Sequence, residues 1–331
     1  MYQPEAYLVV LSFMIVSMIC WGSWANTMKL TPRWPFPLFY WDYVLGLLLT
    51  SLVLALTLGN FRGGPSAFLA NILQVDKSHI GYGLLAGALF NISNLLLVAA
   101  TAIAGLAVAF PIGVGLALVI GAVMNYVLAP RGNPILLSGG VALVTLAIVC
   151  DALAYRKREA GPQKVGSKGI LLSLACGVFM GLSYPVTIRA TLGEHALGPY
   201  SVVVVFAIGA LLCAIPVNYL FMRKPVTGNA PLSMGDYAAG RGWFHWIGVL
   251  GGGIWCFGTV LNLVASHVQV VGPAVSYTIG QGATMVSAAW GVFVWREFAN
   301  APRTSKRWLV AMFVCFLAGL GSVALAPLFT V

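Results

Sequence analysis

Residues 80–129 read IGYGLLAGALFNISNLLLVAATAIAGLAVAFPIGVGLALVIGAVMNYVLA, a run of 50 residues without an Asp, Glu, Lys or Arg. A helix needs about 20 apolar residues to cross a hydrocarbon core about 30 Å thick, so this run is too long for a single crossing. It predicts two membrane-spanning helices, Ile80–Ala104 and Leu106–Ala129, that meet near Gly105. The chain is therefore expected to be an integral membrane protein.

The composition of the whole chain agrees with that expectation. Its 331 residues are 60% hydrophobic and only 8% charged, whereas a soluble domain has about 25% charged residues. So few charges cannot cover a water-soluble surface, and most of the outer surface is expected to face lipid. The net charge of +10 lies in short segments between apolar runs. There it fits membrane topology and anionic headgroups better than it fits nucleic acid.

Similar apolar runs recur along the chain and predict an all-α polytopic membrane protein with ten transmembrane helices. The expected spans are Tyr7–Met28, Leu38–Gly59, Ile80–Ala104, Leu106–Ala129, Pro134–Ala154, Gly169–Ala190, Tyr200–Met222, Trp243–His267, Val270–Trp295 and Trp308–Leu328. The first run is too long for a signal peptide and has no basic leader, so it is interpreted as a retained helix.

A polar stretch between the fifth and sixth spans divides the chain into two sets of five helices, residues 1–160 and 161–331. An internal repeat supports this division, because a shift of 167 residues places Gly105 on Gly272 and Gly115 on Gly282. Five is an odd number, so two such halves must cross the membrane in opposite directions. Inverted repeats of this kind are a recurring plan in transporters.

The distribution of Lys and Arg predicts the orientation of the chain. Loops on the amino-terminal side carry Arg62, Lys77, Arg131 and Arg189. The opposite loops carry Lys29, Arg33, Arg156, Lys157, Arg158, Lys164, Lys168, Arg223, Lys224, Arg241, Arg296, Arg303, Lys306 and Arg307. Cytoplasmic loops are enriched in basic residues, so this second set is expected to be cytoplasmic and both termini outside. The expected location is the inner (plasma) membrane of the cell.

Few ionisable residues lie within the predicted spans. Asp42 is the one acid clearly inside a span, and an acid there is a functional candidate because burying a charge in hydrocarbon is costly. Its carboxylate could bind and release a proton during transport, or it could pair with Lys29 or Arg33 at the interface. Asp151 and Glu297 lie at helix ends beside arginines and are interpreted as ordinary ion pairs.

Neutral amides and aromatic rings recur in the predicted helices and are candidates for binding a solute. The candidate residues are Trp21, Trp24, Asn91, Asn94, Tyr184, Trp255, Tyr277 and Gln281. Amides beside aromatic faces suit a neutral solute that forms hydrogen bonds. The same residue types also join helices to one another, and that alternative stays open. The sequence has no metal-ligand spacing, ATP-binding motif or nucleophile–base pair, so neither a cofactor nor enzymatic activity is expected.

Several segments resemble the ureide permease family. CWGSW (residues 20–24) and YWDYVLG (40–46) are similar to that family's Gly-Thr/Ser-Trp turn and later Leu-Asp-Tyr. FNISN (90–94) is similar to its Gly-Asn-Leu-Ser stretch, and VIGAVMNYVL (119–128) to its Ile-Gly-Thr-x-Leu-Asn-Tyr segment. AAGRGWFHWIGVLGGGIWCFG (238–258) and FVWREF (293–298) extend the resemblance over nearly the whole chain.

The resemblance implies the fold of the drug/metabolite transporter superfamily, with two inverted five-helix repeats. It also implies proton-coupled import of small polar solutes, since family members carry ureides and pyrimidine bases and a sister group of bacterial porters carries sugars. Asp42 matches the family's Asp, and Asn91 matches the Asn of Gly-Asn-Leu-Ser. The chain departs from the family at Phe90, where the family has Gly, and at Thr259, where it often has Asn.

These observations together predict a secondary active transporter, specifically a proton symporter that imports a small neutral polar solute such as a ureide or a nucleobase. A sugar porter of the glucose, ribose or rhamnose type is one alternative, and a drug or metabolite exporter is another. The expected partners are the solute, protons and membrane lipid. The sequence leaves open whether the protein is a monomer or a homodimer.

Overall fold

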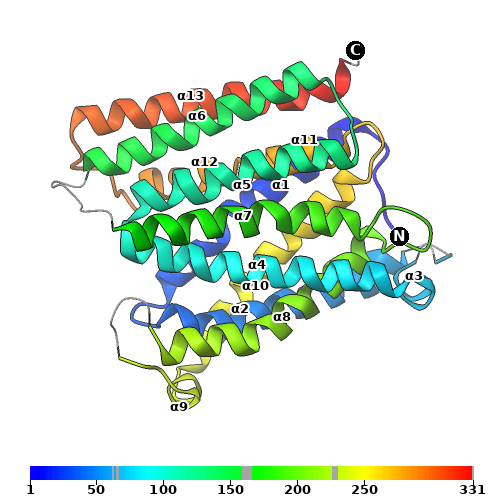
Figure 1. Cartoon of the computed structure of the whole chain (residues 1–331), viewed down its shortest axis with the longest axis horizontal. Coiled ribbons are helices and arrows are strands. Elements are labelled where there is room, and N and C mark those ends of the chain that lie inside the picture. The colour runs from blue at the N-terminus through cyan, green and yellow to red at the C-terminus, as the bar shows by residue number, and fades with distance from the viewer. Residues whose placement is uncertain (62, 65–66, 159–165, 226–229, 330–331) are drawn as a thin grey trace.

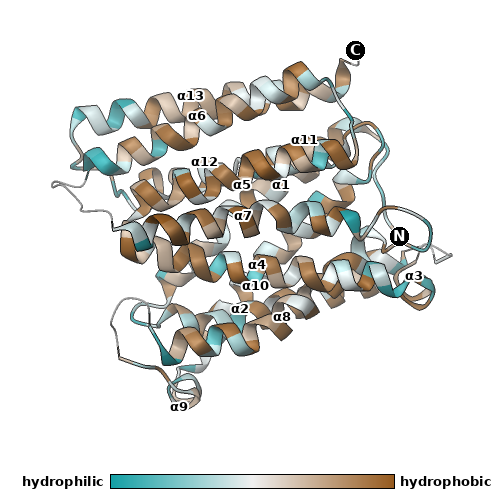
Figure 2. Ribbon diagram, in the orientation of Figure 1, coloured by the Kyte–Doolittle hydropathy of each residue, from teal (hydrophilic) through white to brown (hydrophobic). Residues whose placement is uncertain are grey.

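The computed structural model describes residues 1–61, 63–64, 67–158, 166–225 and 230–329. These residues form helices and connecting segments and contain no strand. Within them, nine helices are long and apolar enough to cross a membrane. Large apolar side chains such as Val127, Phe293 and Leu317 are exposed on the outside, and Figure 2 shows hydrophobic residues along most of the helices. The chain is therefore a polytopic membrane protein, as the composition predicts.

The long helices follow the predicted spans closely. They are α1 (Tyr7–Ser23), α2 (Phe36–Leu56), α4 (Lys77–Ala104), α5 (Leu106–Leu128), α6 (Pro134–Arg158), α7 (Ser167–Arg189), α8 (Pro199–Arg223), α10 (Gly242–Ser266) and α13 (Arg303–Leu325). Short helical segments between or after them are η1 (Trp24–Leu30), η2 (Leu58–Asn60), α3 (Phe68–Gln74), α9 (Met234–Ala238) and η4 (Ala326–Leu328).

The ninth predicted span differs from the others because it is broken. It consists of α11 (Gly272–Gly280), α12 (Ala283–Ala289) and a π-helical turn, η3 (Trp290–Val294). Gln281 and Gly282 form the turn between α11 and α12. A span in three pieces is not a single long helix, so the count of ten transmembrane helices stays a prediction.

Two glycines mark corresponding places in the two halves of the chain. Gly105 has a φ of 75° and separates α4 from α5, while Gly272 has a φ of 72° and begins α11. Positive φ is costly for residues with a side chain but not for glycine, so glycine can end one helix and redirect the chain at once. The boundary predicted at Ala104 and Gly105 is confirmed. The agreement between the two glycines supports the internal repeat, which stays a prediction.

Close glycine contacts hold two helix pairs together. A Cβ atom on Gly46 of α2 would clash with the backbone of Val249 in α10, and one on Gly252 of α10 would clash with that of Tyr43. The same reciprocal arrangement joins α4 to α8, where Gly87 lies against Phe206 and Gly209 lies against Leu84. Small residues allow helix backbones to approach closely in membranes. The pairs α2–α10 and α4–α8 correspond to one another in the predicted repeat.

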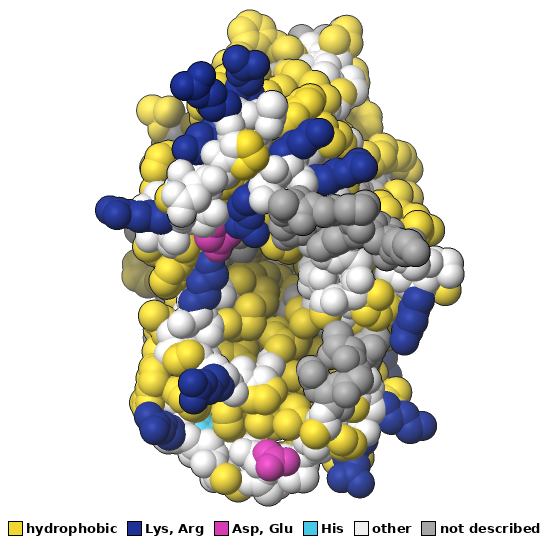
Figure 3. Space-filling model, turned by 90° about the vertical axis from the view of Figure 1, so that its left-hand side faces the viewer, with side chains coloured by type: hydrophobic (Ala, Val, Ile, Leu, Met, Phe, Trp, Pro, Cys, Tyr) yellow, Lys and Arg dark blue, Asp and Glu magenta, His cyan; other side chains and the backbone are white. Residues whose placement is uncertain are grey.

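The helices run roughly alongside one another, with α6 and α13 packed together at one edge (Figure 1). Both chain termini lie at the same end of the bundle. The other end carries many Lys and Arg side chains (Figure 3), and we call it the basic face. Arg158, Arg223 and Arg303 lie at helix ends there. The predicted cytoplasmic residue Lys164 and the predicted external residue Arg62 fall outside the described residues. That the basic face is cytoplasmic stays a prediction.

Candidate solute-binding cavity

A cavity of about 590 Å³ lies between the helices. Its walls come from α1, η1, α4, α5, α6, α7, α8, α10 and the broken ninth span. Lys29, Tyr155 and Glu297 line it near the basic face, and Figure 3 shows a hollow there with hydrophobic side chains inside and basic side chains around it. The cavity is large enough for a small organic solute. It is reached from the basic face.

Most of the residues predicted to bind a solute line this cavity. They are Trp21, Trp24, Asn94, Tyr184, Trp255, Tyr277 and Gln281. Asn91 does not line it. It is fully buried one helical turn from Asn94, and both its amide atoms lack a hydrogen-bond partner among the described residues. The structure therefore brings seven of the eight residues together, while their roles in binding stay predictions.

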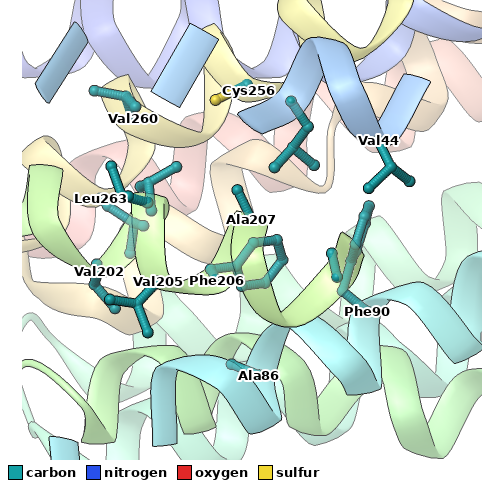
Figure 4. Close-up of a cluster of buried hydrophobic side chains, with 14 of the residues drawn as sticks. Val44, Ala86, Phe90, Val202, Val205, Phe206, Ala207, Cys256, Val260 and Leu263 are labelled. Atoms are coloured by element: carbon teal, nitrogen blue, oxygen red, sulfur yellow. The ribbon is translucent and has the colours of Figure 1, made fainter. Parts of the chain in front are cut away.

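Aromatic rings from four helices cluster around Trp255. The Trp21 ring stacks on the Trp255 ring with their centroids 6.0 Å apart, and the Phe90 and Phe206 rings approach Trp255 to 4.2 and 5.8 Å. Figure 4 shows Phe90 of α4 and Phe206 of α8 among other buried apolar side chains. The indole nitrogen of Trp21 donates a hydrogen bond to Thr259 at 3.0 Å. Phe206 was not predicted, because a single Phe in an apolar helix gives no sequence signal of a binding role.

The two cavity tyrosines use their hydroxyl groups within the protein. Tyr184 donates to the Asn262 side-chain oxygen at 2.6 Å, and Asn262 in turn donates to the Ser276 carbonyl at 3.0 Å. Tyr277 donates to the carbonyl of Ala117 in α5 at 2.9 Å. Tyr184 and Tyr277 therefore fix α7, α10, α11 and α5 relative to one another. They present ring surface to the cavity rather than free hydrogen-bonding groups.

Asn94 and Gln281 differ from these tyrosines because their side-chain amides keep hydrogen-bonding groups without a partner among the described residues. The Asn94 side-chain nitrogen has no hydrogen-bond partner among the described residues, and the Gln281 side chain forms no hydrogen bond with them either. Both residues line the cavity, Asn94 from α4 and Gln281 from the turn between α11 and α12. An amide nitrogen buried without a partner is costly, which applies to Asn94, whereas Gln281 is partly exposed. Asn94 and Gln281 are thus the groups best placed to bond a solute.

Asp42 lies outside the cavity, in a cluster of its own near the basic face. Only 2% of it is exposed, and its carboxylate accepts a hydrogen bond from the Tyr237 hydroxyl at 2.6 Å and contacts His245 Nδ1 at 2.9 Å. Burial and the Asp42 carboxylate raise the pKa of Tyr237. The alternative of an Asp42 pair with Lys29 or Arg33 is wrong, because Asp42 points toward α9 and α10 instead. Its partners lie about 200 residues away in sequence, beyond the reach of sequence patterns.

Glu297 forms the charged rim of the cavity. Its carboxylate pairs with Lys29 Nζ at 2.5 Å and Arg158 Nη1 at 3.1 Å, and it accepts a hydrogen bond from the Tyr155 hydroxyl at 3.4 Å. Partial burial alone would raise the pKa of Glu297, but the bonds and charges of Lys29 and Arg158 outweigh burial and lower it. The ion pair predicted for Glu297 is confirmed. The Glu297 carboxylate at the cavity mouth is therefore paired with cations rather than free.

The ion pair predicted for Asp151 is wrong for the part of the chain that the structure describes. Asp151 is 5% exposed, and one of its carboxylate oxygens has no hydrogen-bond partner there. The reason is geometric, because Arg158 extends from the end of α6 to Glu297 instead. Sequence proximity to Arg156, Lys157 and Arg158 does not show which way these side chains point.

Comparisons with known proteins identify relatives over nearly the whole chain. The model of the family described as sugar transport protein matches residues 12–326. Ureide permease 1 of Arabidopsis thaliana is 24% identical over 97% of this chain and 97% of its own length, and ureide permease 4 of the same plant is 25% identical with the same coverage. These matches confirm the resemblance to the ureide permease family.

A solved crystal structure shares the fold. It aligns with a TM-score of 0.62 and 16% sequence identity, and the alignment covers 95% of this chain and 97% of the other. At that identity the likeness concerns the fold alone.

Proposed function

This chain belongs to the sugar transport protein family and is a transporter rather than an enzyme, and from that premise we propose that it imports a small neutral polar solute such as a ureide or a nucleobase. The names of its relatives support a role for this protein in the transport of small polar solutes in general. The finer assignment rests on the cavity.

The observation that carries the proposal is the pair of unsatisfied amides in an aromatic cavity. Asn94 and Gln281 both line the cavity, and a side-chain amide carries the acceptor and donor groups that the N–H and C=O groups of a ureide or nucleobase require. Flat rings of such solutes can stack on Trp21 or Trp255. The two charged residues in the lining, Lys29 and Glu297, neutralise one another. The carboxylate in the described lining is therefore already paired, which disfavours a cationic solute.

A sugar is the second candidate, because the matching family is described by sugar transport. Sugars also stack on aromatic rings and form hydrogen bonds with amides. The difference lies in shape, since a ureide or base presents coplanar N–H and C=O groups whereas a sugar presents hydroxyl groups around a puckered ring.

Transport is proposed to be secondary and driven by protons. The halves 1–160 and 161–331 would move against each other and expose the cavity to each side in turn. Asp42, the acid inside the second predicted span, is the proposed proton-coupling residue. If Asp42→Asn left proton-driven accumulation intact, Asp42 would not be the coupling residue.

The first experiment is a thermal-shift screen of the purified protein with ureides, nucleobases, nucleosides, hexoses, pentoses and amphiphilic cations. A compound that binds the folded state raises its melting temperature. Selective stabilisation by a ureide or base is expected, and exchange of the labelled compound across proteoliposomes would then test transport. Stabilisation by sugars alone would replace the first candidate with the second. Stabilisation by amphiphilic cations alone would contradict both.

A further inference from the structure

Asp151 is a buried acid that the proposed transport mechanism does not yet use. It lies on α6, is 5% exposed and forms no ion pair with a described residue. Tyr155 lies four residues later on the same helix and therefore on the same face. Tyr155 lines the cavity and donates a hydrogen bond to Glu297 at 3.4 Å. Asp151 is thus placed one helical turn behind the rim of the cavity.

The surroundings of Asp151 favour its neutral acid form. An ionised carboxylate in an apolar interior is very costly unless it is paired and hydrogen-bonded. The side chains around this part of α6 include the apolar residues Ile148, Phe298 and Met312. Tyr155, on the same face of α6 as Asp151, donates a hydrogen bond to Glu297, so the acid that this face approaches carries a charge of the same sign. Two neighbouring carboxylates disfavour a second negative charge, so one proton between them is the stable arrangement.

Glu297 has the opposite surroundings and favours its anion. Lys29 and Arg158 both pair with it, at 2.5 and 3.1 Å. Lys29 also lies over the Trp295 ring, 4.7 Å from its centroid. The remaining titratable neighbours of Asp151 are Tyr155 and the thiol of Cys150, which lies next to Cys315 of α13. No described basic group faces Asp151 in an ion pair.

We propose that Asp151, one helical turn behind the cavity rim, and Glu297, on the rim, form a proton-binding pair, with the proton held on Asp151. No hydrogen bond between described residues joins the two carboxylates, so the proton would cross on water: one O–H bond breaks at Asp151, one forms at Glu297, and the proton then leaves Glu297 for water in the cavity. Glu297 can accept a proton readily only after Lys29 or Arg158 moves away, because both cations stabilise its anion. Proton release is thereby tied to movement of η1 or α6 at the cavity mouth.

The protonation of Asp151 can be tested without knowing the solute. The infrared spectrum of the purified protein in lipid nanodiscs at neutral pH should contain the C=O stretch of a protonated carboxylic acid. Because Asp42 is also a buried acid, the variants are compared in an Asp42→Asn background. There Asp151→Asn should remove the band, whereas Asp236→Asn, at an exposed carboxylate on α9, should leave it in place. Glu297→Gln removes the like charge, so the band should then disappear at a lower pH during alkaline titration. A band that survives Asp151→Asn, or no band in the unmodified protein, overturns the proposal.

The coupling role rests on the proposed function and needs a transport assay. Asp151→Asn keeps the shape of the neutral acid, so proteoliposomes should exchange internal for external solute at the unmodified rate. Accumulation driven by a pH gradient should fall to the equilibrium level, while Asp236→Asn should accumulate normally. Accumulation that persists in Asp151→Asn, or a defect confined to Asp42→Asn, contradicts coupling through Asp151. Absence of exchange of any solute by the unmodified protein would contradict the proposed function but not the infrared result.

Discussion

At the scale of single residues, the cavity contains hydrogen-bonding groups of two kinds. Tyr184 and Tyr277 already bond to the protein, whereas Asn94 and Gln281 have groups left for a solute. Both kinds are polar residues in apolar helices, so the sequence could nominate all four but could not separate them. The separation depends on distances to Asn262 and Ala117, which only the folded chain defines.

Asn94→Leu or Gln281→Leu should each raise the Kd of the bound solute about tenfold, which corresponds to roughly 1.4 kcal/mol for a lost hydrogen bond. Titration of the melting temperature with solute measures the change. Tyr277→Phe is the matched control, because its hydroxyl bonds to Ala117. It should lower stability by about 1 kcal/mol and leave the Kd unchanged. If Tyr277→Phe weakened binding as much as the amide variants, the division between the two kinds of residue would be incorrect.

The pairing of Glu297 with Lys29 and Arg158 predicts a pH dependence of stability. Because the pairing lowers the folded-state pKa of Glu297, it stabilises the fold above the unfolded-state pKa of about 4.3. That contribution is lost as the pH falls through the lower folded-state pKa. The melting temperature should therefore fall on acidification more steeply in the unmodified protein than in Glu297→Gln. A difference between the two proteins that did not change with pH would contradict this sign.

At the scale of helices, the apolar pattern predicted boundaries well and interruptions poorly. The junction of α4 and α5 at Gly105 was predicted because 50 apolar residues exceed one crossing. The hydropathy pattern did not show the break at Gln281 and Gly282, because it is continuous through Val270–Trp295. Hydropathy indicates how well a segment fits the lipid environment. It does not indicate whether the helical hydrogen bonds of its backbone are continuous. The partners of Asp42 were also missed, since pairing between α2 and α9 depends on packing.

The glycine contacts between paired helices predict a specific pattern of stability. Gly252→Ala should destabilise the protein by roughly 1–3 kcal/mol, because its methyl group would clash with the α2 backbone at Tyr43. Gly87→Ala should have a similar effect through α8. Gly139→Ala is the control, because open space surrounds that position on α6. It should leave stability unchanged or raise it, since Ala favours helix over Gly. Melting temperatures in detergent compare the three variants, and equal effects would rule out close packing as the cause.

At the scale of the whole molecule, the cavity is accessible from the basic face, which we expect to be cytoplasmic. In a variant without the native cysteines, Ser287→Cys in the cavity should react with a membrane-impermeant maleimide added on the cytoplasmic side. Glu194→Cys, in the exposed segment after α7, should react only from the other side. Bound solute should slow the first reaction and not the second. Reversed labelling would show that the predicted orientation is wrong.

The single-residue junction at Gly105 limits how α4 and α5 can move. Because no loop separates them, the chain has no slack there, and a displacement of the first turn of α5 must pull the last turn of α4 with it. Asn94 and Phe90 lie on α4, and the Ala117 carbonyl that holds Tyr277 lies on α5. The two helices therefore move together. A displacement of Phe90 on α4 is thus transmitted to the hydrogen bond between Tyr277 and the Ala117 carbonyl on α5.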